Sequence, residues 1–390
     1  MLAPAGASAQ EPATDENRPE VVGGLAFIDE VELTVVSIDV FVTDKSGNAI
    51  TDLEADDFVV FQDGRQRQLS HFALYTEEVI SRIVQSEEDA LGAMPLPTPE
   101  TPAAEPVTTP RAEVKPVYIV LFIDNENLRP MDRNRVLGQI RRFLGEVMYP
   151  HVQVMVVTYQ RSLKVEQPFT SNPREVTDAL RAVRGMNATR GTQDTERKKI
   201  LNEFSSIRQR GTKATEQERM ELESMIRSYA DVIDNELDFA INAVREITAT
   251  LSGLPGRKYL FHISSGLPMV PAKDLLYQLG DTFQQTSTLS MESRLSHRRQ
   301  DQARASAANS QGVTFYTIDS SGMGGAGSSI SAEFAGATDP ITAGLYVINQ
   351  QEPLQYIADK TGGRAILSVN DVTVGLEQFR HDLFSYYSIG

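Results

Sequence analysis

Val117-Tyr118-Ile119-Val120-Leu121-Phe122-Ile123 is the stretch that decides the fold, and Asp124-Asn125-Glu126-Asn127-Leu128 follows it directly. An uninterrupted apolar run of this length predicts a strand that is buried on both faces of a parallel sheet. The next segment, residues 131–147, repeats apolar residues at the spacing of a helix that packs on one face. A buried strand, a short loop and an amphipathic helix together form the first unit of an α/β sheet.

The same alternation continues toward the end of the chain. We expect further strands at 152–159, 163–169, 257–263, 312–318 and 365–367, and further helices at 173–184, 291–309, 353–360 and 372–384. Alternating strands and helices predict a central, mostly parallel sheet with helices on both faces. This α/β domain covers residues 117–390.

Residues 190–252 have no strand pattern and predict a helical insertion into that domain. The part from 214 to 252 predicts one long helix, because its apolar residues follow one another at steps of three or four and form a single stripe. The stripe comprises Leu222, Ile226, Tyr229, Ile233, Leu237, Ala240, Val244, Ile247 and Leu251. Two interpretations stay open: the stripe lies on the sheet, or it binds a partner or a second copy of the chain.

The N-terminal tail, residues 1–28, is rich in Pro, Gly, Ala and acidic residues and is predicted to be disordered. Its Ala7-Ser8-Ala9 pattern before Gln10 resembles the end of a secretory signal peptide, which predicts an exported protein. The alternative is an Ala-rich tail without a leader function. Only the first interpretation says anything about the compartment.

A small β unit is expected over residues 29–78, where apolar residues alternate and Gln62-Asp63-Gly64 is a strong hairpin signal. Residues 79–116 follow as a linker rich in Pro. Proline fixes φ and removes a backbone donor, so the linker is predicted to be extended.

Composition excludes several functional classes. Lys and Arg number 37 against 53 Asp and Glu, a net charge of −16, which argues against binding to nucleic acid or to anionic lipid. There is no cysteine, so a disulfide framework, a thiolate metal site and a cysteine nucleophile are excluded. No apolar run reaches the roughly 18 residues that a membrane-spanning helix needs.

Several motifs of the α/β domain together resemble the von Willebrand factor type A domain, and in particular a bacterial, acidobacterial group related to it. They are Leu254-Pro255-Gly256-Arg257-Lys258 before a buried strand, Gly312-Val313-Thr314-Phe315-Tyr316-Thr317-Ile318-Asp319, and Thr361-Gly362-Gly363-Arg364-Ala365. The N-terminal β unit resembles the leader segment of the same group through residues 42–47 and 57–64. The resemblance implies a Rossmann-like domain together with a small β-sandwich-like unit.

The same resemblance implies a metal site for Mg²⁺ or Mn²⁺ at the carboxyl ends of the strands. Asp124 matches the first ligand of the family's Asp-x-Ser-x-Ser motif, but Glu126 and Leu128 replace its two serines, and leucine cannot ligate a metal. The threonine ligand is Thr192 or Thr189, and Ser265 stands where the family has an Asp. The candidate metal ligands are therefore Asp124, Glu126, Thr192 and Ser265.

Two interpretations of this degenerate site remain. Glu126 compensates for the lost ligands with a second carboxylate, or the site holds no metal and Asp124 is a loop acid. In both cases the resemblance implies a protein partner at this face, with Asn125, Asn127, Leu128, Ser264 and Gly266 as the partner-binding residues.

The leading hypothesis is a non-enzymatic, exported protein of the binding or adhesion type. The alternative is an assembly module that self-associates through the helix at 214–252. A third hypothesis, a serine hydrolase that uses Ser265 near His262, has little support because the G-x-S-x-G pattern lacks its first glycine. In the family, residues 386–390 lead into a further β segment, so we expect the chain to be a piece of a longer protein.

Overall fold

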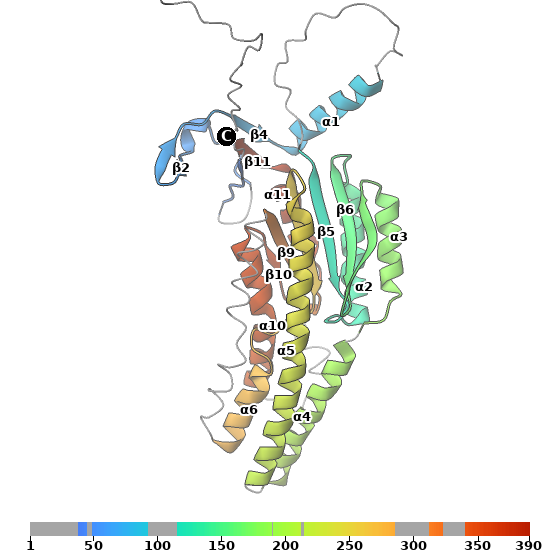
Figure 1. The fold of residues 1–390 in the computed structure, drawn as a ribbon, viewed down its shortest axis with the longest axis vertical. Coiled ribbons are helices and arrows are strands. Elements are labelled where there is room, and N and C mark those ends of the chain that lie inside the picture. Colours follow the sequence, from blue (N-terminus) through green and yellow to red (C-terminus); the bar gives the residue numbers. More distant parts are fainter. Residues whose placement is uncertain are drawn as a thin grey trace, which may run out of the picture.

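The fold was obtained as a computed structural model, which describes residues 38–44, 49–92, 115–188, 190–211, 214–284, 312–322 and 340–390. Four of the sequence expectations lie wholly or largely outside these ranges. They are the tail at 1–28, the Pro-rich linker over 93–114, the helix at 291–309 and the alternative ligand Thr189. Figure 1 shows a central sheet between two layers of helices, with a small sheet at one end and a helical extension at the other.

Within the described ranges, six strands form the central sheet in the order β10-β9-β8-β5-β6-β7. All neighbouring pairs are parallel except β6 and β7, which are antiparallel. The bounds are β5 (Val117–Asp124), β6 (Val152–Tyr159), β7 (Leu163–Thr170), β8 (Arg257–Ser264), β9 (Val313–Asp319) and β10 (Ala365–Ile366). The predicted fold class is confirmed: this is a mostly parallel, Rossmann-like sheet.

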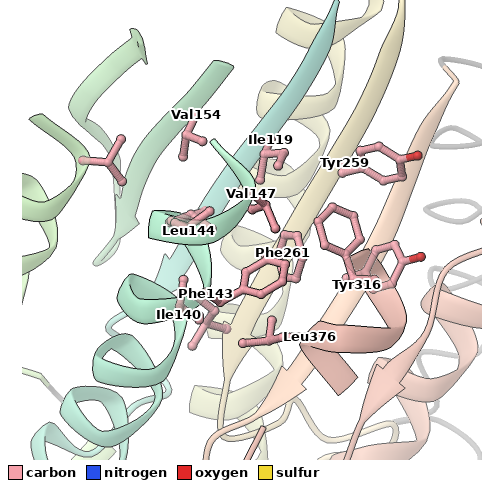
Figure 2. Packing of buried hydrophobic residues seen from close by; sticks show 14 of the residues in the cluster. Ile119, Ile140, Phe143, Leu144, Val147, Val154, Tyr259, Phe261, Tyr316 and Leu376 are labelled. Atoms are coloured by element: carbon pink, nitrogen blue, oxygen red, sulfur yellow. The ribbon is translucent and has the colours of Figure 1, made fainter. Parts of the chain in front are cut away.

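The apolar run at 117–123 forms most of the central strand β5. Its side chains alternate between two hydrophobic cores, because successive residues of a strand face opposite sides. Ile119 and Leu121 belong to one core and Phe122 to the other. The first core is covered by α2 (Pro130–Val147), α3 (Pro173–Arg184) and α11 (Thr373–Phe384). Figure 2 shows Phe143 of α2 and Leu376 of α11 among the strand residues of this core.

The second core is covered by α5 (Glu216–Ser252) and α10 (Pro340–Lys360). Helix α5 begins with a capping box in which Thr215 and Glu218 satisfy each other's backbone amides. Its second half lies on the sheet, through Val244, Ile247 and Leu251. Its first half extends past the sheet and packs against α4 (Arg190–Arg210) and α6 (Lys273–Phe283), so that these helices form an arm at one end of the molecule (Figure 1).

This packing decides between the two interpretations of the apolar stripe. Leu222 and Ile226 are fully buried against α4 and α6, and Leu237 to Leu251 are buried against the sheet. The prediction that this stripe is a surface for self-association is therefore wrong. The physical reason is that α4 and α6 supply apolar partners that the sequence could not place in space.

The small sheet differs from the expected β-sandwich-like unit. Among the described residues it has three antiparallel strands in the order β1-β11-β4, formed by β1 (Ile38–Val40), β4 (Phe72–Tyr75) and the C-terminal β11 (Tyr386–Ile389). A separate hairpin pairs β2 (Val60–Gln62) with β3 (Arg65–Arg67), as its turn signal predicts. Helix α1 (Glu77–Gly92) occupies the start of the segment that was expected to be an extended linker.

Candidate functional site

The candidate site lies where the chain reverses its direction of travel across the sheet. From β5 the sheet grows to one side through β6 and β7, and to the other side through β8, β9 and β10. The carboxyl ends of the neighbouring strands β5 and β8 therefore lie at the switch point, which is where open α/β sheets bind ligands. In this protein the loops that follow the two strands are joined, because the Ser265 amide donates to the Asn127 carbonyl oxygen over 3.1 Å. Asp124 ends β5, Ser264 ends β8 and Asp319 ends β9.

Asp124 is fully buried at this switch point and its carboxylate is enclosed by hydrogen-bond donors. Ser264 Oγ donates to Oδ2 over 3.0 Å and Asn127 Nδ2 donates to the same oxygen over 2.9 Å. The backbone amide of Asn127 donates to Oδ1 over 3.2 Å, which closes a tight turn after the strand. The carboxylate is tolerated in such a dry place because these donors replace its water.

Among the candidate metal ligands, only Glu126 accompanies Asp124, as a buried residue two positions further along the same loop. Leu128 is a core residue with no exposed surface. Thr192 is an exposed residue of α4, and Ser265 Oγ is hydrogen-bonded to Ser320 Oγ at 2.8 Å. The described residues contain no cluster of three or more carboxylates or imidazoles suited to a metal ion. The residues present at this edge therefore do not fit the metal site of the type A family.

All five predicted partner-binding residues are buried, and the contacts of Asn125 and Gly266 show structural roles instead. Asn125 accepts a hydrogen bond from Arg133, a fully buried arginine of α2 that also donates to the carbonyl oxygens of Arg184 and Met186. Gly266 adopts a positive φ of 96° and lies so close to α10 that a Cβ would meet the Gln350 carbonyl oxygen at 2.6 Å. The prediction that these residues bind a partner is therefore wrong, because residues with almost no exposed surface cannot contact a partner. The five buried residues are Asn125, Asn127, Leu128, Ser264 and Gly266.

Ser264, His262 and Asp124 lie together at this edge, but their hydrogen bonds are not those of a catalytic triad. A triad needs a serine that donates to histidine and a histidine that donates to aspartate. Here Ser264 donates directly to Asp124, and His262 Nε2 lies 3.8 Å from the same carboxylate without a hydrogen-bond partner among the described residues. Ser265 points to Ser320. Within the described residues, this arrangement provides no histidine base for either serine.

A groove of about 560 Å³ lies beside the loop that follows β5, at the root of the helical arm. We call it the α4–α5 groove. Its lining residues come from α4, from α5, and from the loops that follow β5 and β6. They are Glu126, Arg161, Thr192, Gln193, Glu196, Ile200, Ser224, Met225, Ser228, Tyr229, Val232, Ile233 and Glu236. Sequence reasoning identified Glu126 and Thr192 but not the α5 wall.

The groove has an acidic end where β5 and α5 approach each other. Burial raises the pKa of Glu236, and the negative charge of Glu126 raises it further, although Arg161 and Arg190 oppose this. Burial also raises the pKa of Tyr159, with smaller contributions from the charges of Asp124, Glu126 and Glu236. The carboxylates of this end thus lie close enough to repel one another.

Comparison with known proteins gives structural neighbours alone. No protein-family model matches the chain, and no curated protein matches its sequence. Similar solved structures include the conserved hypothetical protein BatB from Bacteroides thetaiotaomicron, with 12% identity, a TM-score of 0.30, and coverage of 68% of this chain and 98% of that one. The vWF domain of the type V pili tip protein Mfa5 from Porphyromonas gingivalis has 12% identity, a TM-score of 0.36, and coverage of 70% and 96%. The PilB minor pilin from Streptococcus sanguinis has 11% identity, a TM-score of 0.34, and coverage of 70% of this chain and 62% of that one.

The strand order and the two helical layers carry the assignment of the fold. Starting from β7, the sheet runs 3-2-1-4-5-6 when its strands are numbered along the chain, with the third strand antiparallel. The α/β domain therefore has the mostly parallel, Rossmann-like sheet that the resemblance to the von Willebrand factor type A domain implies. Similarities of such low identity and TM-score carry no argument about activity.

Proposed function

We propose that this chain is a non-enzymatic, exported binding module that holds a protein partner at the carboxyl edge of its sheet. The observation that carries the proposal is the α4–α5 groove, which opens at that edge beside exposed apolar side chains of α5. Met225 is 37% exposed and Val232 is 52% exposed. Apolar surface of this kind beside a concave site is typical of a protein interface.

The degenerate metal site supports binding without a metal ion. Asp124 is held by Asn127 and Ser264, so its lone pairs are directed at protein donors and not at an open coordination position. The partner would contact the α4–α5 groove, where side chains are exposed. The serine-hydrolase alternative lacks a serine–histidine hydrogen bond within the described residues.

Export rests on the Ala7-Ser8-Ala9 pattern of the N-terminal tail. Among the described residues, no helix has the length and apolar character needed to cross a membrane. The assembly alternative has lost the surface that motivated it, because α4, α6 and the sheet cover the apolar stripe of α5.

Site-specific photo-crosslinking in the native host tests this proposal. A photoreactive residue in place of Met225, at the groove, should give a discrete adduct with another protein. The same residue in place of Val374, an exposed residue of α11 outside the groove, should not. Equal adducts from both positions, or none from either, would remove the support for a partner at this edge. An adduct of twice the chain mass would instead favour self-association.

A further inference from the structure

The shape of the α4–α5 groove suits an extended or helical protein segment. Helix α4 forms one wall through Thr192, Gln193 and Glu196, and α5 forms the other. The volume of about 560 Å³ lies within the roughly 300–1,000 Å³ range of ligand pockets, so it admits more than one side chain. Tyr229 and Ile233 contribute aromatic and apolar surface to it.

The apolar face continues along α5 beyond the groove. Met225, Val232 and Phe239 follow one another at intervals of seven residues, which is two helical turns, and therefore share one face of the helix. Each is exposed, and Phe239 is 60% exposed. This row is separate from the buried stripe and is available to a partner.

The charges of the groove select the chemistry of that partner. Among its lining residues, three are carboxylates, Glu126, Glu196 and Glu236, and one is a cation, Arg161. The Arg161 side chain is 83% exposed and its Nε lies 3.9 Å from Glu126 Oε1, so water and salt screen its contribution. Glu196 pairs with Lys199 at the surface, and Gln193 donates to Glu236.

We propose that the α4–α5 groove binds a lysine- or arginine-containing amphipathic segment of the protein partner. This inference rests on the proposed function and names the class of partner. The aliphatic stem of a lysine fits along the apolar wall of α5 while its ammonium group reaches the acidic end of the groove. Apolar residues of the same segment cover Met225, Val232 and Phe239.

A cation from the partner relieves a repulsion that is already present in the protein. Burial and the charge of Glu126 both disfavour the ionised form of Glu236. An ammonium or guanidinium group placed between these carboxylates favours that form again. In a metal-dependent type A site, a carboxylate of the partner binds the metal ion. In this groove the carboxylates belong to the protein itself, so the complementary group of the partner is a cation.

The first test uses the full chain and two fluorescein-labelled amphipathic peptides. One is made of leucine and lysine, and the other has glutamate at each lysine position. The lysine peptide should bind at least about tenfold more tightly, and Glu236→Gln should weaken it by about five- to tenfold because one partly buried ion pair is lost. Val232→Ser should weaken both peptides, and Glu236→Lys should reverse the preference.

Matched variants control for general attraction of the basic peptide to an acidic protein. Glu246→Gln removes the same charge from an exposed position of α5 outside the groove, and Val374→Ser removes an exposed valine from α11. Both should leave binding within about twofold. Equal weakening by Glu236→Gln and Glu246→Gln would overturn the proposal, as would binding that Val232→Ser does not change.

The second test separates this inference from the proposed function. The Met225 crosslink should decrease in Glu236→Gln and persist in Glu246→Gln. A crosslink that persists in both would leave the proposed function standing and overturn the basic class of the partner. If a photoreactive residue gives no crosslink at any position of the groove, both the proposed function and the basic class of the partner would be overturned. Light scattering that shows a dimer, lost in Val232→Ser, would mean that a second copy of the chain occupies the groove and would overturn the proposal.

Discussion

Asp124 is the residue whose surroundings decide what the carboxyl edge can do. Its carboxylate is fully buried and accepts hydrogen bonds from Asn127 and Ser264. A metal ligand of the type A kind needs a carboxylate that faces an open position. In this chain the same aspartate instead fixes the loop after β5 to the end of β8.

We predict that Asp124→Ala lowers the free energy of unfolding by about 3 kcal/mol, because it leaves the buried donors of Ser264 and Asn127 without an acceptor. Urea denaturation measures the change. Thr192→Ala, at an exposed position of α4, serves as the control and should stay within about 0.5 kcal/mol. A loss below about 1 kcal/mol for Asp124→Ala would show that water satisfies these donors.

Calorimetric titration of Mg²⁺ and Mn²⁺ into metal-stripped protein tests whether this edge of the sheet binds a metal ion. We expect no binding in the micromolar range, since the candidate ligands do not converge. Micromolar binding that both Asp124→Ala and Glu126→Ala abolish would contradict this. It would mean that Glu126 compensates for the missing serines.

At the scale of elements, the arm is held by polar anchors within an apolar interface. Arg197 of α4 is buried and donates to Asp274 of α6 over 2.6 Å, and its guanidinium lies 4.0 Å from the ring centre of Tyr346 of α10. Arg190 of α4 likewise donates to the hydroxyl of Tyr346. These contacts position α4, and with it one wall of the groove.

We predict that Arg197→Met destabilises the protein by about 3–5 kcal/mol, because it leaves the carboxylate of Asp274 buried and unpaired. Thermal and urea unfolding measure the change. Lys199→Met breaks the exposed pair with Glu196 on the same helix and should cost at most about 0.5 kcal/mol.

The double variant Arg197→Met with Asp274→Leu sharpens this test. Removing both charges should recover most of the lost stability, since apolar side chains of similar size replace a buried ion pair at little cost. A double variant as unstable as the single one would show that packing on Tyr346, and not the ion pair, holds the arm.

At the scale of the whole molecule, the last strand joins the ends of the described chain. β11 lies between β1 and β4, and its Tyr386 stacks on Tyr75 at 4.8 Å and beneath the guanidinium of Arg257 at 4.0 Å. Arg257 begins β8. The small sheet is thus attached to the amino edge of the central sheet, at the opposite end from the arm (Figure 1).

We predict that deletion of residues 386–390 abolishes the small sheet while the central sheet remains folded, because β1 and β4 do not pair with each other. Hydrogen exchange at 38–40 and 72–75 should become at least about tenfold faster, with β5 and β8 unchanged. Tyr386→Ala should show the same pattern more weakly, and Phe61→Ala, at a 65% exposed position, should not. Unchanged exchange at 72–75 would show that β4 is stable without β11.

The sequence was sufficient to predict the central domain. The apolar run at 117–123 can only be buried from both sides, which requires helices on both faces of a sheet. The long helix at 214–252 and the hairpin at 62–64 follow from local patterns as well. Local structure of this kind can be predicted from the sequence because residues that are neighbours in the chain interact directly.

Contacts between distant segments were decided by the tertiary structure. It enclosed Asp124 with Ser264, covered the α5 stripe with α4 and α6, and inserted β11 between β1 and β4. It also formed the α4–α5 groove from Glu126 and Glu236, which are far apart in the chain. Hydrogen bonds, burial and mutual repulsion depend on distances in space, and one sequence without that geometry does not contain them.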